Sequence, residues 1–269
     1  MTTTHTVEVP GAELYYEVRG DGPVLVALGS PMDSGPFAQL ADLMAGDRTV
    51  VTLDPRGISN STVTDPDQDS TPDLRADDVA AILDHLGAPT ADLLGSSGGA
   101  VTGLALAVGH PGRLRTLVAH EPPLLTLLPD AEQRLAAAEE NIAIYHRDGV
   151  GAAWMRFMAD AGFDLGGDDA PPPPHEPSEQ DLSNSARFFG HELRFTVGYR
   201  PEVEALKNGP TRVVIGIGDE SGSLLTNATS AALAQLLGIE RVQFPGGHGG
   251  FMEQPKEFAE VLRVVLTEG

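Results

Sequence analysis

A serine at position 97 lies in a glycine-rich turn that could make its hydroxyl reactive. Residues 93–100, LLGSSGGA, match the pattern G-x-S-x-G with Ser97 at the centre. A sharp strand-to-helix turn of this kind strains the backbone of its central residue, so the neighbouring residues must be small. The hydroxyl then stands free above the sheet, and the next backbone N–H, that of Gly98, faces a developing oxyanion. An apolar run precedes the turn and a helix-compatible stretch follows it, which predicts a nucleophilic serine.

A nucleophilic serine needs a base, and His248 is the best-placed candidate among eight histidines. A hydroxyl at its ordinary pKa attacks poorly without a base, and that base needs an orienting acid. His248 lies in FPGGHGGF, residues 244–251, between the last expected strand and the closing helix. No regular secondary structure is expected to constrain it there, so it is the predicted base.

The acid that would orient His248 has two candidates. Glu121 ends an apolar run and is followed by Pro122 and Pro123, which would fix its direction. Asp219 follows a later apolar run, within GIGDES at residues 216–221. Each could equally be a surface carboxylate, and Glu220 is a third alternative. The sequence leaves this choice open.

Short apolar segments alternate with helical segments along most of the chain, a pattern typical of an α/β protein. The continuous apolar runs predict a mostly parallel, eight-stranded sheet covered on both faces. Strands are expected at residues 6–9, 14–18, 24–28, 50–53, 93–94, 117–119, 212–217 and 242–244. Helices are expected at residues 35–45, 72–86, 100–109, 227–237 and from 254 onward.

Residues 122–209 interrupt this alternation. Helices are expected at 132–146, 150–161 and 179–199, with a loop at 162–178 that carries four consecutive prolines, 171–174. A helical insertion between two core strands predicts a cap over one edge of the sheet, although a peripheral layer without function is the alternative. The expected domains are therefore a core of 1–121 and 210–269 and a cap of 122–209. Aromatic side chains of the cap should make part of a pocket apolar.

These motifs make the chain similar to the α/β-hydrolase superfamily over nearly its whole length. Residues 54–61, DPRGISNS, resemble the family's D-x-R-G-x-G-x-S loop, with Ser59 in place of a usual glycine. Gly29-Ser30-Pro31 resembles its H-G-x-P turn, with Leu28 where histidine is usual. The resemblance implies an α/β-hydrolase fold and makes the N–H of Ser30 the second oxyanion donor beside Gly98.

The resemblance also offers two positions for the acid that would orient His248. Most members place it after the seventh strand, near Asp219, whereas some, such as haloalkane dehalogenases, place it after the sixth, where Glu121 stands. The stretch AHEPP at 119–123 is similar to esterase-like members of the family. His120, beside Glu121, is expected to be a structural histidine, and Arg56 a structural ion-pair residue.

Composition excludes several other classes of function. The formal net charge of −22, from 39 acidic and 17 basic residues, disfavours nucleic acid and membrane partners. The absence of cysteine rules out disulfides, thiolate metal sites and cysteine nucleophiles. No metal motif is present, and Asp219 and Glu220 would repel a dinucleotide pyrophosphate at the glycines 216 and 218. We therefore expect no cofactor and no metal. Without a signal peptide or an apolar run long enough to span a membrane, we expect a cytoplasmic protein.

The sequence thus predicts a serine hydrolase that cleaves a carboxylic ester or lactone of a small, largely apolar substrate through an acyl-enzyme. Ser97 would attack, His248 would take the proton, and Glu121 or Asp219 would orient the histidine. Acyl transfer or cyclisation in natural-product metabolism would use the same nucleophile and base and stays an alternative. A non-catalytic protein of the same fold that binds a small ligand is another.

Overall fold

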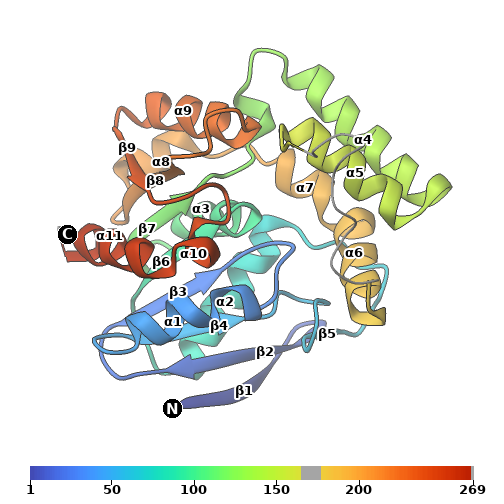
Figure 1. Ribbon diagram of the computed structural model, residues 1–269. Coiled ribbons are helices and arrows are strands. Elements are labelled where there is room, and N and C mark those ends of the chain that lie inside the picture. The colour runs from blue at the N-terminus through green and yellow to red at the C-terminus, as the bar shows by residue number, and fades with distance from the viewer. Residues whose placement is uncertain (165–176, 268–269) are drawn as a thin grey trace.

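A computed structural model describes residues 1–164 and 177–267, and its strands form one twisted sheet (Figure 1). The strands described are nine, in the order β1-β2-β4-β3-β6-β7-β8-β9, with β5 paired to β2. Their bounds are β1 (Thr2–Val9), β2 (Ala12–Arg19), β3 (Val24–Leu28), β4 (Thr49–Leu53), β5 (Thr62–Val63), β6 (Ala91–Ser96), β7 (Leu114–His120), β8 (Arg212–Gly218) and β9 (Arg241–Phe244). The four prolines at 171–174, in the loop predicted over 162–178, lie outside the described residues.

The sheet is antiparallel at one end and parallel through the rest. β1 and β2 form a hairpin, β2 also runs antiparallel to β4, and every neighbouring pair from β4 to β9 is parallel. This confirms the predicted fold class and mostly parallel sheet. The ninth strand, β5, was not predicted because two residues are too short to show an alternating pattern.

Helices cover both faces of the sheet, which explains the continuous apolar strands. The helices are α1 (Ala38–Met44), α2 (Pro72–His85), α3 (Gly98–Gly109), α4 (Ala131–Asp148), α5 (Val150–Ala161), α6 (Glu179–His191), α7 (Leu193–Val197), α8 (Val203–Asn208), α9 (Leu225–Leu237), α10 (Gly250–Glu253) and α11 (Pro255–Thr267). Short 3₁₀ turns occur at Gly35–Phe37 and Leu125–Leu127. One apolar core joins the sheet to α2, α3 and α9, and a second joins its other face to α1 and α11.

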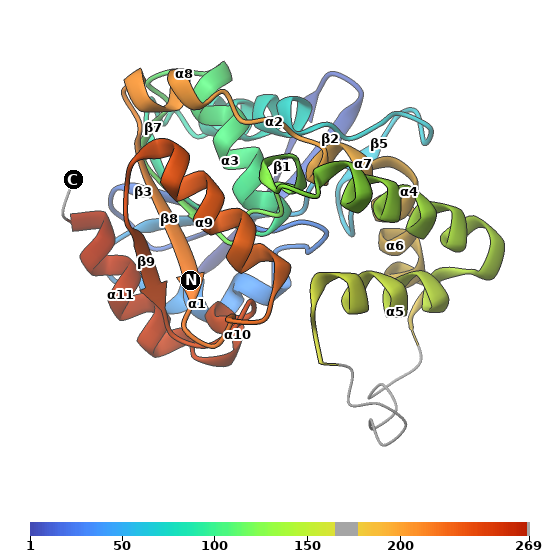
Figure 2. The ribbon, with the colours of Figure 1, turned by 90° about the horizontal axis from the view of Figure 1, so that it is seen from above.

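Helices α4, α5, α6 and α7, here called the helical layer, stand to one side of the sheet (Figures 1 and 2). They have an apolar core of their own, which includes Ile142, Ala153, Phe188 and Phe189. The single helix predicted over 179–199 is divided at Glu192, whose φ of −125° and ψ of −47° depart from helical values. The short helices α8 and α10 were not predicted.

One buried arginine connects the helical layer to the core. Arg75, on α2, donates from Nη2 to Thr196 Oγ1 of α7 (2.9 Å) and from Nε to Thr102 Oγ1 of α3 (3.0 Å). Its Nη1 lies 3.4 Å from Oε1 of the buried Glu192. Thr102 in turn donates to the carbonyl of Gly98, one residue after Ser97 (3.2 Å). The helical layer is therefore joined by hydrogen bonds to the first turn of the helix that follows Ser97.

Close backbone packing requires glycine in the turn around Ser97. A Cβ built on Gly99 would lie 2.2 Å from the carbonyl oxygen of Leu28, and one on Gly95 would lie 2.4 Å from the carbonyl oxygen of Gly99. Both obstructing atoms are backbone and cannot move aside like a side chain. These glycines let α3 pack against the ends of β3 and β6.

We predict that Gly99→Ala lowers the free energy of unfolding by about 1–3 kcal/mol, because the added methyl overpacks rigid backbone. Gly109→Ala, at the other end of α3, is the matched control, since a Cβ there meets nothing within 4 Å. It should leave stability unchanged or raise it by up to about 1 kcal/mol. Urea denaturation followed by circular dichroism measures both, and equal midpoints for the two variants would contradict this account of the turn.

Candidate active site

Ser97 occupies the strained turn between β6 and α3 that the sequence predicted. Its φ of 54° and ψ of −122° are unfavourable for a residue with a side chain. Its N–H donates to the His120 carbonyl at the end of β7 (2.9 Å), and its carbonyl accepts the N–H of Ala100 (3.0 Å). The Gly98 N–H opens α3 and so has no acceptor within the helix. The positive end of α3 thus lies beside the Ser97 side chain.

Ser30 lies against this turn. A Cβ added to Gly98 would lie 2.6 Å from Ser30 Oγ, so glycine at 98 lets the loop after β3 approach α3. Ser30 is buried, and its Oγ has no hydrogen-bond partner within the described part of the chain. The two positions predicted to donate to an oxyanion are therefore adjacent.

Asp54 holds the loop after β3 in place. Its buried carboxylate accepts the Ser34 N–H through Oδ1 (2.8 Å) and the N–H of Asn60 through Oδ2 (3.0 Å). The loops after β3 and β4 are thereby joined at one charge. The resembled family has a histidine at the position of Leu28, which here is a buried apolar residue at the end of β3. A side-chain hydrogen bond of Asp54 holds the loop after β3 to the loop after β4. The sequence motif contained Asp54 but did not reveal this role.

The backbone conformation of Ser59 shows why glycine is usual at this position of the resembled motif. Its φ is 48°, in the left-handed region that glycine adopts most easily. The Ser59 Oγ donates to Asp33 Oδ2 (2.7 Å), and its N–H donates to Asn184 Oδ1 of α6 (2.9 Å). Arg56 is buried and pairs with Asp78 through two hydrogen bonds (2.7 and 2.5 Å), as expected of a structural ion-pair residue.

Glu121 is the carboxylate that contacts His248. Its Oε2 lies 2.5 Å from His248 Nδ1, although the two residues are 127 positions apart in sequence. The same oxygen accepts from Thr226 Oγ1 (2.8 Å), and Oε1 accepts the Gly218 N–H (2.9 Å). Glu121 is fully buried, with 0% of its side chain exposed, whereas His248 is 21% exposed. Its φ is 53°, in the left-handed region that residues with a side chain seldom adopt.

These contacts keep Glu121 ionised despite its burial. Burial by itself would raise the pKa of a carboxyl group, but the hydrogen bond and charge of His248 lower the pKa of Glu121 to about 2. An ionised carboxylate can only accept hydrogen bonds, so the proton of His248 lies on Nδ1. The other ring nitrogen, Nε2, is then the one that can accept a proton from a serine.

Asp219, the other candidate acid, follows β8 and contacts the backbone of the His248 loop rather than the His248 side chain. It is exposed, and its Oδ1 accepts the N–H of Gly246 (2.9 Å), which joins the end of β8 to the loop that carries His248. Glu220 is also exposed. Gly218 lies close to that loop: a Cβ there would meet the carbonyl oxygens of Gly246 and Gly247 at 2.5 and 2.6 Å. This packing is the physical reason for glycine at the end of β8.

Thr226, near the start of α9, is a site residue that the sequence analysis missed. It donates to Glu121 and lines the same cavity as His248. A threonine early in a helix carries no signal that distinguishes it from a solvent-facing one. His120 is fully buried between Phe244 and Phe258, and burial lowers its pKa to about 4, so it is a neutral structural histidine.

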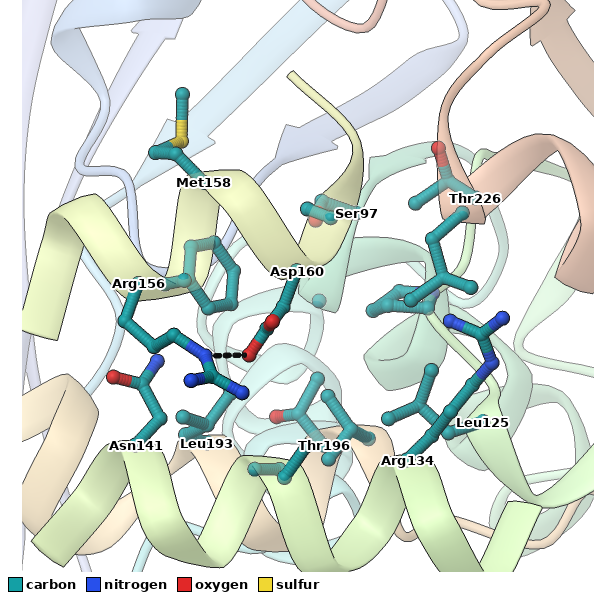
Figure 3. Close-up of a pocket in the computed structure, with 18 of the residues that line it drawn as sticks. Ser97, Leu125, Arg134, Asn141, Arg156, Met158, Asp160, Leu193, Thr196 and Thr226 are labelled. Atoms are coloured by element: carbon teal, nitrogen blue, oxygen red, sulfur yellow. Dashed lines mark hydrogen bonds and ion pairs between the residues drawn. The ribbon is translucent and has the colours of Figure 1, made fainter. Parts of the chain in front are cut away.

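A cavity of about 510 Å³ joins these residues to the helical layer (Figure 3). Ser30, Ser97, Gly98, Thr226 and His248 line its core side. The other lining side chains are mostly apolar: Pro31, Met32, Pro123, Leu125, Ala137, Ala138, Trp154, Phe157, Met158, Ala161, Phe163, Phe188, Leu193, Val197 and Leu225. Several aromatic side chains of the helical layer therefore face the cavity, as the sequence predicted.

A serine in a strained turn at the end of a parallel strand, with a histidine and a buried carboxylate from later segments, is the arrangement typical of α/β hydrolases. The chain belongs to the alpha/beta hydrolase family, whose model matches residues 24–261. It is 32% identical over 269 residues to the uncharacterized hydrolase YraK of Bacillus subtilis (strain 168), an alignment that covers 98% of this chain and 96% of that protein.

Solved structures share this fold over the whole chain. A thermophilic esterase from Thermogutta terrifontis superposes with a TM-score of 0.71 at 22% identity, over 100% of this chain and 98% of that one. The enol-lactonase from Burkholderia xenovorans LB400 gives a TM-score of 0.65 at 19% identity, over 98% and 100% of the two chains.

No group of three or more histidine, aspartate or glutamate side chains in residues 1–164 and 177–267 is placed to hold a metal ion. In the same part of the chain, no helix is both long and apolar enough to cross a membrane.

The pKa of Glu121 predicts how stability depends on pH. The pKa is about 2 in the folded protein, against an ordinary value of 4.5. Between these two values the unfolded chain binds the proton more readily, so this contribution to stability is complete above pH 4.5 and is lost as pH falls through 2. Urea denaturation at a series of pH values should show a steeper loss between pH 4.5 and 2 for the wild type than for Glu121→Gln. Parallel pH dependences would contradict the assignment.

Proposed function

We propose that the protein is a serine hydrolase that cleaves a carboxylic ester or lactone through an acyl-enzyme, with Ser97, His248 and Glu121 as its triad. The observation that carries this proposal is the 2.5 Å contact of Glu121 with His248, a residue that lines the same cavity as the strained Ser97. A nucleophile, a base and an orienting acid are the groups that a serine triad uses for this chemistry.

In the proposed reaction, Ser97 Oγ attacks the substrate carbonyl carbon while His248 Nε2 takes the hydroxyl proton. Glu121 holds the Nδ1–H tautomer and stabilises the imidazolium. The N–H groups of Gly98 and Ser30 stabilise the oxyanion. The bond between the acyl carbon and the alcohol oxygen then breaks, and the alcohol leaves with the proton from His248. His248 then deprotonates a water molecule that attacks the acyl carbon, and as the bond from that carbon to Ser97 Oγ breaks, His248 returns the proton to Ser97 and the acid is released.

The cavity supports a small and largely apolar substrate. Its volume of about 510 Å³ lies within the range of sites for small molecules, and apolar side chains dominate its lining. The esterase and the enol-lactonase that share the fold both cleave acyl–oxygen bonds, by the chemistry that their names state. In a lactone the leaving alcohol remains attached to the acyl group, so a single hydroxy acid would be released.

The first test asks whether Ser97 is activated. Treatment of the wild type with a fluorophosphonate should give one covalent adduct by intact mass, and Ser97→Ala should give none. Ser96→Ala is the matched control, because Ser96 is the buried neighbour of Ser97 and should leave labelling intact. A folded wild type that stays unlabelled would overturn the hydrolase proposal and favour a ligand-binding role.

The second test separates the two acidic candidates. Glu121→Gln should lower kcat by about 10³- to 10⁴-fold, because an amide neither stabilises the imidazolium nor holds the right tautomer. Asp219→Asn should lower it less than about 10-fold, since it affects only the hydrogen bond to Gly246. Hydrolysis of a 4-nitrophenyl ester provides the assay. The reverse order of effects would assign the acid to Asp219.

A further inference from the structure

Asn141 is a buried amide in the wall of the cavity with an unpartnered oxygen. It lies on α4, only 2% exposed, and its Oδ1 has no hydrogen-bond partner among residues 1–164 and 177–267. It lines the cavity that also contains Ser97 (Figure 3). A buried amide oxygen without a partner destabilises the fold, so such groups are rare without a structural or functional reason.

Three other polar side chains that line this cavity from the helical layer, Trp154, Arg134 and Arg156, each have a partner. Trp154 Nε1 donates to Ser185 Oγ (3.0 Å). Arg134 and Asp130 form an ion pair on α4 at 2.9 Å, and Arg156 and Asp160 form one on α5 at 2.7 Å. The unpartnered oxygen of Asn141 differs from these groups, because Asn141 is buried whereas both ion pairs are partly exposed to solvent.

The same pairs indicate the charge of the ligand. Each of the two arginines that line the cavity already has a carboxylate within hydrogen-bond distance, also in the cavity lining. The hydrogen bond from Arg134 lowers the pKa of Asp130, so that carboxylate stays ionised beside its partner. With these charges balanced, neither arginine offers a free cation to an anionic substrate, which favours a neutral group at Asn141.

A hydroxyl is the neutral group that suits this amide best. The oxygen and nitrogen of an asparagine side chain exchange places when the amide flips, so the group facing the cavity is either an acceptor or a donor. A hydroxyl can donate to the oxygen and accept from the nitrogen, and so satisfies both orientations. A keto group could only accept, and an ether likewise.

We propose that Asn141 is a specificity-determining residue that hydrogen-bonds a hydroxyl group on the otherwise apolar ester or lactone cleaved at Ser97. This rests on the proposed hydrolase function and narrows its substrate to a hydroxylated, uncharged acyl compound. Because Asn141 belongs to α4 and Ser97 to the core, the hydroxyl lies away from the scissile carbonyl, on the part of the substrate that enters the helical layer.

The test compares δ-decalactone with derivatives hydroxylated at successive carbons of the pentyl chain. Ring opening is followed by proton release in a weakly buffered indicator assay. In the wild type, one position of the hydroxyl should raise kcat/KM relative to the others and to the unsubstituted lactone. Asn141→Leu should lower that preference by about 10- to 100-fold, the equivalent of one well-placed hydrogen bond.

Gln133→Leu is the matched control, because Gln133 lines the same cavity from the same helix but is exposed to solvent. It should keep the preference of the wild type. Asn141→Leu should also keep or raise Tm, since an unpaired buried amide is replaced by an apolar side chain of similar size. A lower Tm would mean that Asn141 serves folding and would overturn the proposal. Asn141→Ala, which adds no bulk, should show the same loss of preference.

Calorimetry on the Ser97→Ala background separates this proposal from the hydrolase proposal, because binding needs no turnover. The preferred hydroxylated lactone should bind at least 10-fold more weakly when Asn141→Leu is added. If the wild type cleaves δ-decalactone but no hydroxyl position changes kcat/KM or binding, the role of Asn141 is wrong and the hydrolase function stands. If no lactone or ester is cleaved but binding still depends on Asn141, the hydrolase function fails and the subsite stands.

Discussion

One buried carboxylate holds the site together. Glu121, at the end of β7, accepts hydrogen bonds from the end of β8, from the start of α9 and from the loop that carries His248. A carboxylate removed from water is costly unless its oxygens are fully paired, and removal of one partner of such a pair is strongly destabilising. The charge that orients the histidine therefore also fixes the relative positions of the segments around it. Function and local stability depend on the same contacts.

The backbone around the site is strained where the chemistry requires it and closely packed where the strain must be resisted. Among the described non-glycine residues, those with positive φ are Ser59, Ser97 and Glu121, and the last two are the proposed nucleophile and acid. Such conformations persist only where the surrounding structure leaves no alternative. Here the parallel strands β6 and β7 and the close contacts at Gly95 and Gly99 supply that rigidity. The sheet and the closely packed glycines thus hold Ser97 and Glu121 in backbone conformations that they would leave in a less rigid setting.

The core carries the proposed catalytic residues, and the helical layer carries much of the wall that would contact the substrate. Ser30, Ser97, Gly98 and His248 belong to the ends of core strands and the loops after them, whereas Asn141 and much of the apolar wall belong to α4–α7. The same reaction can then serve different substrates by changes in the helical layer alone, in keeping with the way one fold hosts many functions. Arg75 joins the two parts, because its guanidinium is bonded to Thr196 of α7 and to Thr102 of α3. A rearrangement of the helical layer would therefore alter the hydrogen bonds at the first turn of α3, next to Ser97.

The sequence by itself determined the α/β architecture, the serine turn and the histidine loop. These features are local: apolar runs, glycine spacing and the order of strands are legible along the chain, and the observed strands start and end within a few residues of their predicted positions. The choice between Glu121 and Asp219 as the partner of His248 was decided only by the tertiary structure. It depends on a backbone turn at residue 121 and on segments that are 97 to 127 positions apart. Thr226 and Asn141 were equally invisible, because a polar residue on a helix looks the same in sequence whether it faces water or a cavity. Burial and pairing arise from packing between distant segments, and only the folded chain brings those segments together.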